Sequence, residues 1–136
     1  MEAGELLLQS ARYGDLEDLD TALSAGADVN GEDGDRNTAV FLAAANGHIE
    51  VIRVLLDKNA DVSRRNASGS TALHWAALNG SVEVCRLLME AGADPTIANN
   101  FNRTPKTEAT ANGHLEAFMV LDRTFEGPAP AAASDE

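Results

Sequence analysis

The sequence is poor in cysteine, and it contains no long apolar runs. Cys85 is the only cysteine among 136 residues, so no intramolecular disulfide can form, and a reducing cytoplasmic or also nuclear setting is expected. The opening MEAGELLLQS carries two acids and lacks the basic start and the apolar run of roughly 7 to 15 residues that mark a signal peptide. No stretch approaches the roughly 20 apolar residues that a membrane span requires, so no membrane association is expected.

Basic residues are also scarce, with 10 Lys and Arg against 22 Asp and Glu, and the net charge is −12. This deficit argues against direct binding of nucleic acid, whose phosphates select for Lys and Arg. The acids gather at the start of the chain, where residues 1–37 hold ten acids and only two cations, a net charge of −8. Such a field would steer a basic protein partner toward this end. The alternative is that the charge serves solubility alone.

The motifs of common catalytic and nucleotide-binding sites are missing. The chain contains no Gly-x-Ser-x-Gly, no Gly-x-x-x-x-Gly-Lys and no His-Glu-x-x-His. Carboxylate pairs such as Glu17 and Asp18 are expected on a solvated helix face. The sequence therefore predicts a protein that is not an enzyme and that needs no metal and no cofactor.

A repeat of 33 residues is the main positive feature of the sequence. A shift of this length aligns TAVFLAAANG (38–47) with TALHWAALNG (71–80) and then with TPKTEATANG (104–113). A constant period in this range is the signature of stacked repeats. We predict one domain over residues 1–126, followed by a disordered, acidic, Pro/Ala-rich tail over residues 127–136. The predicted repeats span about 4–36, 37–69, 70–102 and 103–126.

Each repeat is expected to contain two short helices. In the third repeat, Thr71 can cap a first helix, and Gly80 can end it in the left-handed conformation. Apolar residues at 3–4 spacing then predict a second helix that stops near Gly92. Helices this short are marginal alone in water, so the repeats must stack. The 33-residue register puts Cys85 in a core column with Leu19, Ile52 and Phe118, which predicts a buried thiol without reactivity.

The stretch Thr71-Ala72-Leu73-His74-Trp75-Ala76 follows the pattern Thr-Pro-Leu-His-x-Ala, and on this pattern and the 33-residue period the chain resembles the ankyrin-repeat family. The resemblance implies an all-α solenoid of four helix-turn-helix units with hairpin-like fingers and a concave binding face. It also implies that His74 bonds to neighbouring backbone. Phe41 replaces this histidine in the second repeat, which removes the bond there. Lys106-Thr107 replaces Leu-His in the fourth repeat, which identifies a C-terminal cap and leaves the packing of its first helix open.

The resemblance also implies where a protein would bind. In this family, binding residues lie on the exposed side of the first helices and on the fingers, and exposed aromatic residues anchor interfaces. The expected residues on the helices are Gln9, Arg12, Tyr13, Leu42, Asn46, Trp75, Leu78, Asn79, Glu108 and Asn112, and those on the fingers are Asp35, Asn37, Ser68, Ser70, Phe101 and Arg103.

The function expected from these observations is non-enzymatic protein binding by a monomer. Trp75 and the degenerate last repeat also make the chain similar to fungal ankyrin-repeat chaperones of a basic small-subunit ribosomal protein, which implies a chaperone or adaptor for a basic partner. One alternative is a regulator or inhibitor that binds a kinase or another signalling domain through the concave groove, as small ankyrin inhibitors of cyclin-dependent kinases do. A general scaffold is the other.

Overall fold

The structure is a computed structural model that describes residues 1–122. The predicted end of the domain at residue 126 and the predicted disorder of residues 127–136 lie outside the described residues and stay predictions. The described part of the chain folds into eight helices: α1 (Ala3–Tyr13), α2 (Leu16–Ser24), α3 (Ala39–Ala45), α4 (Ile49–Asp57), α5 (Ala72–Asn79), α6 (Val82–Glu90), α7 (Pro105–Ala111) and α8 (Leu115–Leu121).

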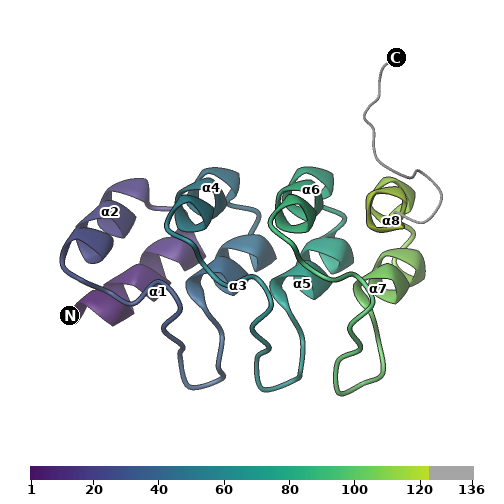
Figure 1. Ribbon diagram of the computed structural model, residues 1–136, viewed down its shortest axis with the longest axis horizontal. Coiled ribbons are helices and arrows are strands. Elements are labelled where there is room, and N and C mark those ends of the chain that lie inside the picture. The colour runs from purple at the N-terminus through teal and green to yellow at the C-terminus, as the bar shows by residue number, and fades with distance from the viewer. Residues whose placement is uncertain (123–136) are drawn as a thin grey trace, which may run out of the picture.

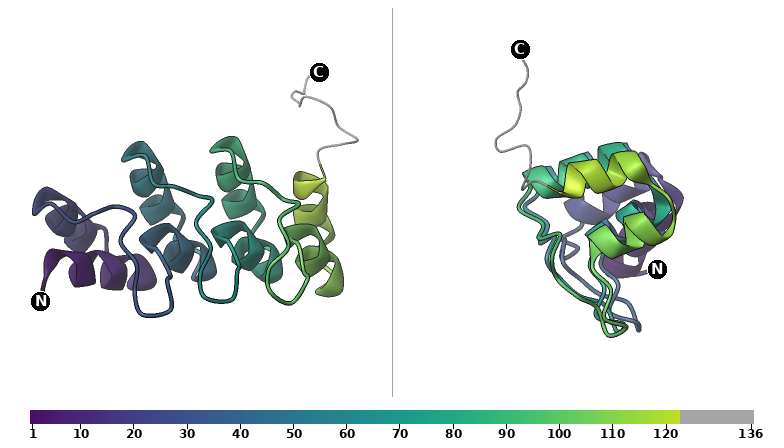
Figure 2. Two further views of the ribbon diagram at one scale, coloured as in Figure 1. Left: turned by 60° about the horizontal axis from the view of Figure 1, so that its bottom comes forward. Right: turned by 90° about the vertical axis from the view of Figure 1, so that its right-hand side faces the viewer.

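The helices form two layers, as Figure 1 shows. The first helices of the repeats, α1, α3, α5 and α7, lie side by side in one layer, and the second helices lie in the other. The loops that connect consecutive repeats project from the helices as three parallel fingers. The view along the row in Figure 2 shows the helix pairs stacked behind one another, with all three fingers on one side. The predicted all-α solenoid of helix-turn-helix units with hairpin-like fingers is confirmed.

The helix ends follow from local sequence chemistry. Thr38 and Thr104 precede α3 and α7, and their hydroxyl oxygens accept the backbone N–H three residues on, at 3.3 and 3.1 Å. Gly80 ends α5 in the left-handed conformation, with φ at 70°, which glycine adopts without the steric cost of a Cβ. Thr71 is the N-cap residue of α5, so both predicted cap positions of the third repeat are confirmed.

The first helix departs from the repeat register. Residue 5 takes the column of the capping threonines, yet α1 begins at Ala3 and runs for 11 residues, against 7 or 8 in the other first helices. Glu2 and Glu5 cap it reciprocally. Without a threonine to start the helix at the usual place, the capping pair shifts three residues earlier and adds most of a turn.

The core runs through the stacked columns as expected. Leu19, Ile52 and Cys85 have no exposed surface. Phe118, the fourth member of this column, is half-buried, because no further helix of the described chain packs beyond α8. Burial raises the pKa of the Cys85 thiol to about 12, so the thiol stays protonated at neutral pH.

The packing of the fourth repeat, which the sequence left open, is resolved. Pro105 and Ala109 of α7 are buried. Thr107 takes the part that the histidine plays in the third repeat, since its hydroxyl oxygen accepts the Thr104 N–H at 2.7 Å. Lys106 is half-buried, and its Nζ lies 3.4 Å from a carboxylate oxygen of Asp122. The polar substitutions are tolerated because α7 is the last helix of its layer within residues 1–122. Within residues 1–122, no helix is both long enough and apolar enough to span a membrane.

Candidate functional site

Each finger is closed by a side-chain oxygen in the same sequence column. Asp33, Asn66 and Asn99 accept the backbone N–H groups of the residues two and four positions on, over 2.9 to 3.1 Å. Burial alone would raise the pKa of Asp33, but the hydrogen bonds from the backbone of Asn37 and Asp35 outweigh it and lower the pKa below its ordinary value. Sequence reasoning did not single out these three positions, although their 33-residue spacing was a readable signal.

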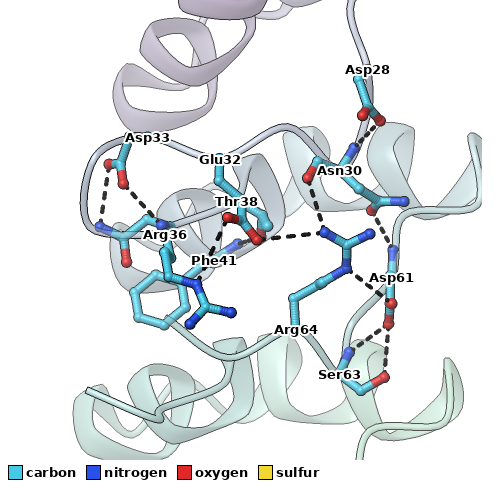
Figure 3. A network of polar contacts seen from close by, with 11 residues as sticks. Asp28, Asn30, Glu32, Asp33, Arg36, Thr38, Phe41, Asp61, Ser63 and Arg64 are labelled. Atoms are coloured by element: carbon cyan, nitrogen blue, oxygen red, sulfur yellow. Dashed lines mark hydrogen bonds and ion pairs between the residues drawn. The ribbon is translucent and has the colours of Figure 1, made fainter. Parts of the chain in front are cut away.

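The fingers are joined to one another by main-chain hydrogen bonds. The N–H of Ala67 donates to the carbonyl of Asp35, and the N–H of Asn100 donates to the carbonyl of Ser68, both at 2.9 Å. A polar network next to the base of the first two fingers adds to this connection (Figure 3). There, the guanidinium of Arg64 lies 3.5 Å from Glu32 and 3.3 Å from Asp61. The row of fingers therefore presents its residues at a regular spacing.

The structure exposes most of the predicted binding residues. Three of them are half-buried, namely Asn37, Ser68 and Leu78. The exposed ones are Gln9, Arg12, Tyr13, Asp35, Asn46, Trp75, Asn79, Phe101, Arg103 and Asn112. We call the surface formed by these thirteen residues the inner face.

Three predicted binding residues are buried, and their expected exposure was wrong. Leu42 is 6% exposed and belongs to the core cluster. Ser70 is equally buried because its hydroxyl accepts a hydrogen bond from the Asn99 amide, at 3.0 Å, which joins two fingers. Glu108 is 8% exposed, and its carboxylate lies 3.4 Å from the guanidinium of Arg103. Their columns contain exposed residues in other repeats, namely Gln9 and Trp75 in one and Arg103 in the other.

Aromatic residues give the inner face its apolar surface. Trp75 is 37% exposed, and its ring meets the ring of buried Phe41 edge-on, with centroids 6.2 Å apart. The indole is thus held in place on one side and presented on the other. Tyr13 and Phe101 are 72% and 71% exposed. Exposed aromatic side chains that a scaffold already holds lose little conformational freedom on binding.

His74 connects the helix layer to the third finger. Its Nδ1 accepts the backbone N–H of Thr71 at 3.0 Å, so Nε2 carries the proton and donates to the carbonyl of Arg103 at 2.9 Å. Burial lowers the pKa of His74 and favours the neutral ring that this arrangement needs. The role that the resemblance implied for His74 is confirmed. This contact ties the base of the third finger to α5, the helix that carries Trp75.

Three asparagines form a regular row at the C-terminal ends of the first helices. The side-chain amides of Asn46, Asn79 and Asn112 each donate to a backbone carbonyl, at 2.8 to 2.9 Å. Each bond uses one of the two N–H groups of the amide, so each side chain keeps its oxygen and a second N–H for other partners. Tyr13 takes the same column in the first repeat. The row therefore offers oxygen acceptors, beside N–H donors, to a partner.

Acidic side chains gather at the N-terminal end of this surface. Glu5 lies one helical turn before Gln9, on the same side of α1, and Asp35 is exposed on the first finger. Further exposed acids lie on α2, namely Glu17, Asp18 and Asp20. The opposite end of the inner face carries Arg103. Within residues 1–122, no three His, Cys, Asp or Glu side chains gather closely enough to hold a metal ion.

Comparison with known families gives one match. A family model described as ankyrin repeats (3 copies) matches residues 7–99, about two thirds of the chain. The matched region begins within α1, covers α2 to α6 and ends at residue 99 within the third finger, and α7 and α8 lie beyond it. No curated protein matches the chain.

Proposed function

Since the chain belongs to the ankyrin-repeat family, whose repeats are general protein–protein interaction modules, we propose that it binds a basic protein through the inner face and acts as its chaperone or adaptor. The bound form of the chain is a monomer with one partner. Proteins of this family are typically non-enzymatic binding modules, and the proposed role requires no catalytic step.

Trp75 is the observation that carries the proposal. Its ring is held against Phe41, yet more than a third of the side chain remains exposed. Well-packed aromatic residues near the middle of an interface contribute much of the binding free energy, while surrounding residues exclude water. Trp75 lies on α5, the third of the four first helices, and members of the inner face lie on both sides of it, with Tyr13 on α1 and Asn112 at the end of α7.

Charge supports a basic partner. The acids at the N-terminal end of the inner face and on α2 attract cations, and the asparagine row offers oxygen acceptors to the N–H groups of Lys and Arg. Exposed charges interact over a Debye length of about 10 Å at 0.1 M salt. Binding that depends on them is therefore expected to weaken as salt is added.

The test is capture of partners from a cell extract at low and at moderate salt, with identification of the retained proteins by mass spectrometry. The affinity of the chain for each retained protein is then measured with purified components. We expect a basic protein, such as a ribosomal one, to bind at low salt and to be lost from Trp75→Ala. Asp35→Asn should weaken binding and flatten its salt dependence. Asp57→Asn, at the far end of α4, changes the net charge equally and serves as the control without effect.

Two results would refute the proposal. One is retention of a neutral or acidic domain, such as a kinase, regardless of salt, which would instead support the regulator hypothesis. The other is a Trp75→Ala variant that loses stability in a urea melt as much as it loses binding, which would identify Trp75 as core.

A further inference from the structure

Glu108 is a buried carboxylate whose two oxygens differ in their surroundings. The residue is 8% exposed, and its Oε1 lies 3.4 Å from a guanidinium nitrogen of Arg103. Within residues 1–122, no group donates a hydrogen bond to Oε2. Buried charges in proteins are normally paired and hydrogen-bonded, because their removal from water costs free energy. One oxygen of this carboxylate is therefore available to a further donor.

Glu108 lies next to the helix that carries Trp75. It takes the same repeat column as Gln9 and Trp75, which are both exposed on the inner face, so the three side chains project to the same side of the helix layer. Figure 1 shows α5 and α7 side by side, and packed helices lie about 8 to 10 Å apart. Arg103 contacts both helices, since its carbonyl accepts a hydrogen bond from His74 and its guanidinium reaches Glu108. The indole and the carboxylate thus lie within reach of one side chain of a partner.

Trp75 offers an aromatic surface at this place. The ring of Phe41 meets the indole from α3, the neighbouring helix on the side away from α7, and 37% of Trp75 remains exposed. The π face of an aromatic ring attracts cations, and tryptophan does so most strongly. A cation that reaches Glu108 therefore gains a second favourable contact on Trp75.

The two contacts together favour a guanidinium over an ammonium. A guanidinium is planar, so it can stack on an indole while the N–H groups at its edge donate to a carboxylate. The ammonium of lysine is a compact point charge that is more strongly hydrated. Within the described part of the chain, Arg103 is the only cation paired with Glu108, and it contacts only Oε1. The donor for Oε2 is therefore sought in a partner.

We infer that Glu108 and Trp75 form a site for one arginine side chain of the partner, whose guanidinium donates to Oε2 of Glu108 and packs on the exposed part of the Trp75 indole. This inference rests on the proposed function, since it names the side chain by which a basic protein is recognised on the inner face. Trp75 supplies contact area, and Glu108 supplies the selectivity for charge. A neutral side chain of the same shape keeps the packing and loses the charge-assisted hydrogen bond.

Three capped tripeptides serve as probes, with alanine at both ends and arginine, lysine or citrulline in the middle. Citrulline keeps the length and the planar end group of arginine but has no charge. Each peptide is titrated at constant ionic strength into the full-length chain labelled with ¹⁵N. The signals followed are the indole N–H of Trp75, the only tryptophan of the chain, and the backbone N–H of Glu108. We expect saturable shifts with millimolar arginine peptide, weaker binding of the lysine peptide, and about tenfold weaker binding of the citrulline peptide, the effect of losing roughly one charge-assisted hydrogen bond.

Variants of the chain separate this site from general attraction between charges. Glu108→Gln keeps the shape of the side chain and should lower the affinity for the arginine peptide to that for the citrulline peptide. Glu116→Gln, at an exposed acid of α8, changes the net charge equally and should leave the affinity unchanged. Arg103→Ala should strengthen binding, because it removes a like charge and frees Oε1 for a second N–H of the guanidinium. Trp75→Leu, followed at the Glu108 amide, should weaken binding of all three peptides but keep the preference for arginine over citrulline. Urea melts check that each variant is folded.

Several results would each overturn the inference. On the wild-type chain these are citrulline or lysine peptides that bind as tightly as the arginine peptide, and the absence of saturable shifts at millimolar peptide. Among the variants they are an unchanged affinity in Glu108→Gln and weaker binding by Arg103→Ala. The proposed function fails by a different result, since Trp75→Ala would then retain the basic partner from the extract. A chain that loses its partner through Trp75→Ala but does not distinguish arginine from citrulline has a functional inner face and no arginine site at Glu108.

Discussion

Replacing Gly80 by alanine is expected to destabilise the protein more than replacing Gly47 by alanine, although both glycines follow a first helix. Both are left-handed, with φ of 70° and 73°, and alanine in this conformation costs about 1 to 2 kcal/mol. At Gly47 an added Cβ would meet no atom within 4 Å, but at Gly80 it would lie 2.5 Å from Nδ1 and 2.6 Å from Cγ of His114. The imidazole must turn away, which adds about 1 kcal/mol for an unfavourable rotamer and lost contacts.

The expected losses in the free energy of unfolding are therefore about 1 to 2 kcal/mol for Gly47→Ala and about 2 to 3 kcal/mol for Gly80→Ala. Urea denaturation followed by far-UV circular dichroism measures both, provided that the slope with denaturant stays constant. Adding His114→Ala to Gly80→Ala removes the obstructing ring, and the double-mutant cycle should show a coupling of about 1 kcal/mol. Equal losses for the two glycine variants, or a coupling near zero, would refute the reasoning.

Three further predictions concern the buried histidine, the left-handed residues of the fingers and the buried thiol. Burial lowers the pKa of His74 in the folded state, so the unfolded chain binds a proton at this histidine more tightly than the folded chain does. The stability that is present above the unfolded pKa of about 6.5 is therefore lost as pH falls toward the folded pKa. The urea midpoint of the wild-type chain should thus decrease between pH 7 and pH 5, and the midpoint of His74→Phe should decrease less over this interval. If the midpoints of the two proteins fall in parallel, other groups are responsible for the pH dependence. Arg36→Gly should stabilise the chain by about 1 kcal/mol because it removes the steric cost of a Cβ in the left-handed conformation, whereas Gly69→Ala should destabilise the chain by adding that cost. Urea midpoints that move in the same direction for both variants would contradict the finger geometry. Cys85, with its pKa near 12, should react with a thiol reagent only as fast as the native protein opens, so rapid labelling without urea would contradict its burial.

Sequence periodicity predicted much of the helical architecture from particular residues. Thr71, Gly80 and His74 have the roles expected of them, because helix caps depend on the residue itself and on neighbours within one turn. The burial of Cys85 followed from its column in the stack. The early start of α1 was not predicted, since Glu2 and Glu5 cap it in a way that the other repeats do not share.

The candidate site was less predictable. Leu42 shares a column with exposed Trp75 and is nevertheless buried, because exposure depends on the size of the side chains in the adjacent repeat. Ser70 is buried by a contact with the next finger, which its own column does not reveal.

The sequence by itself determined the 33-residue unit, its caps, its buried columns and the acidic N-terminal end, because each of these depends on residue type and spacing along the chain. Only the tertiary structure decided which parts of the columns stay exposed and that Trp75 packs against Phe41. It also decided that Ala67 and Asn100 bond to neighbouring fingers, while the Phe101 carbonyl has no donor within residues 1–122. The physical reason is that these properties belong to the surface between repeats, where burial and hydrogen bonding depend on two side chains from different repeats at once.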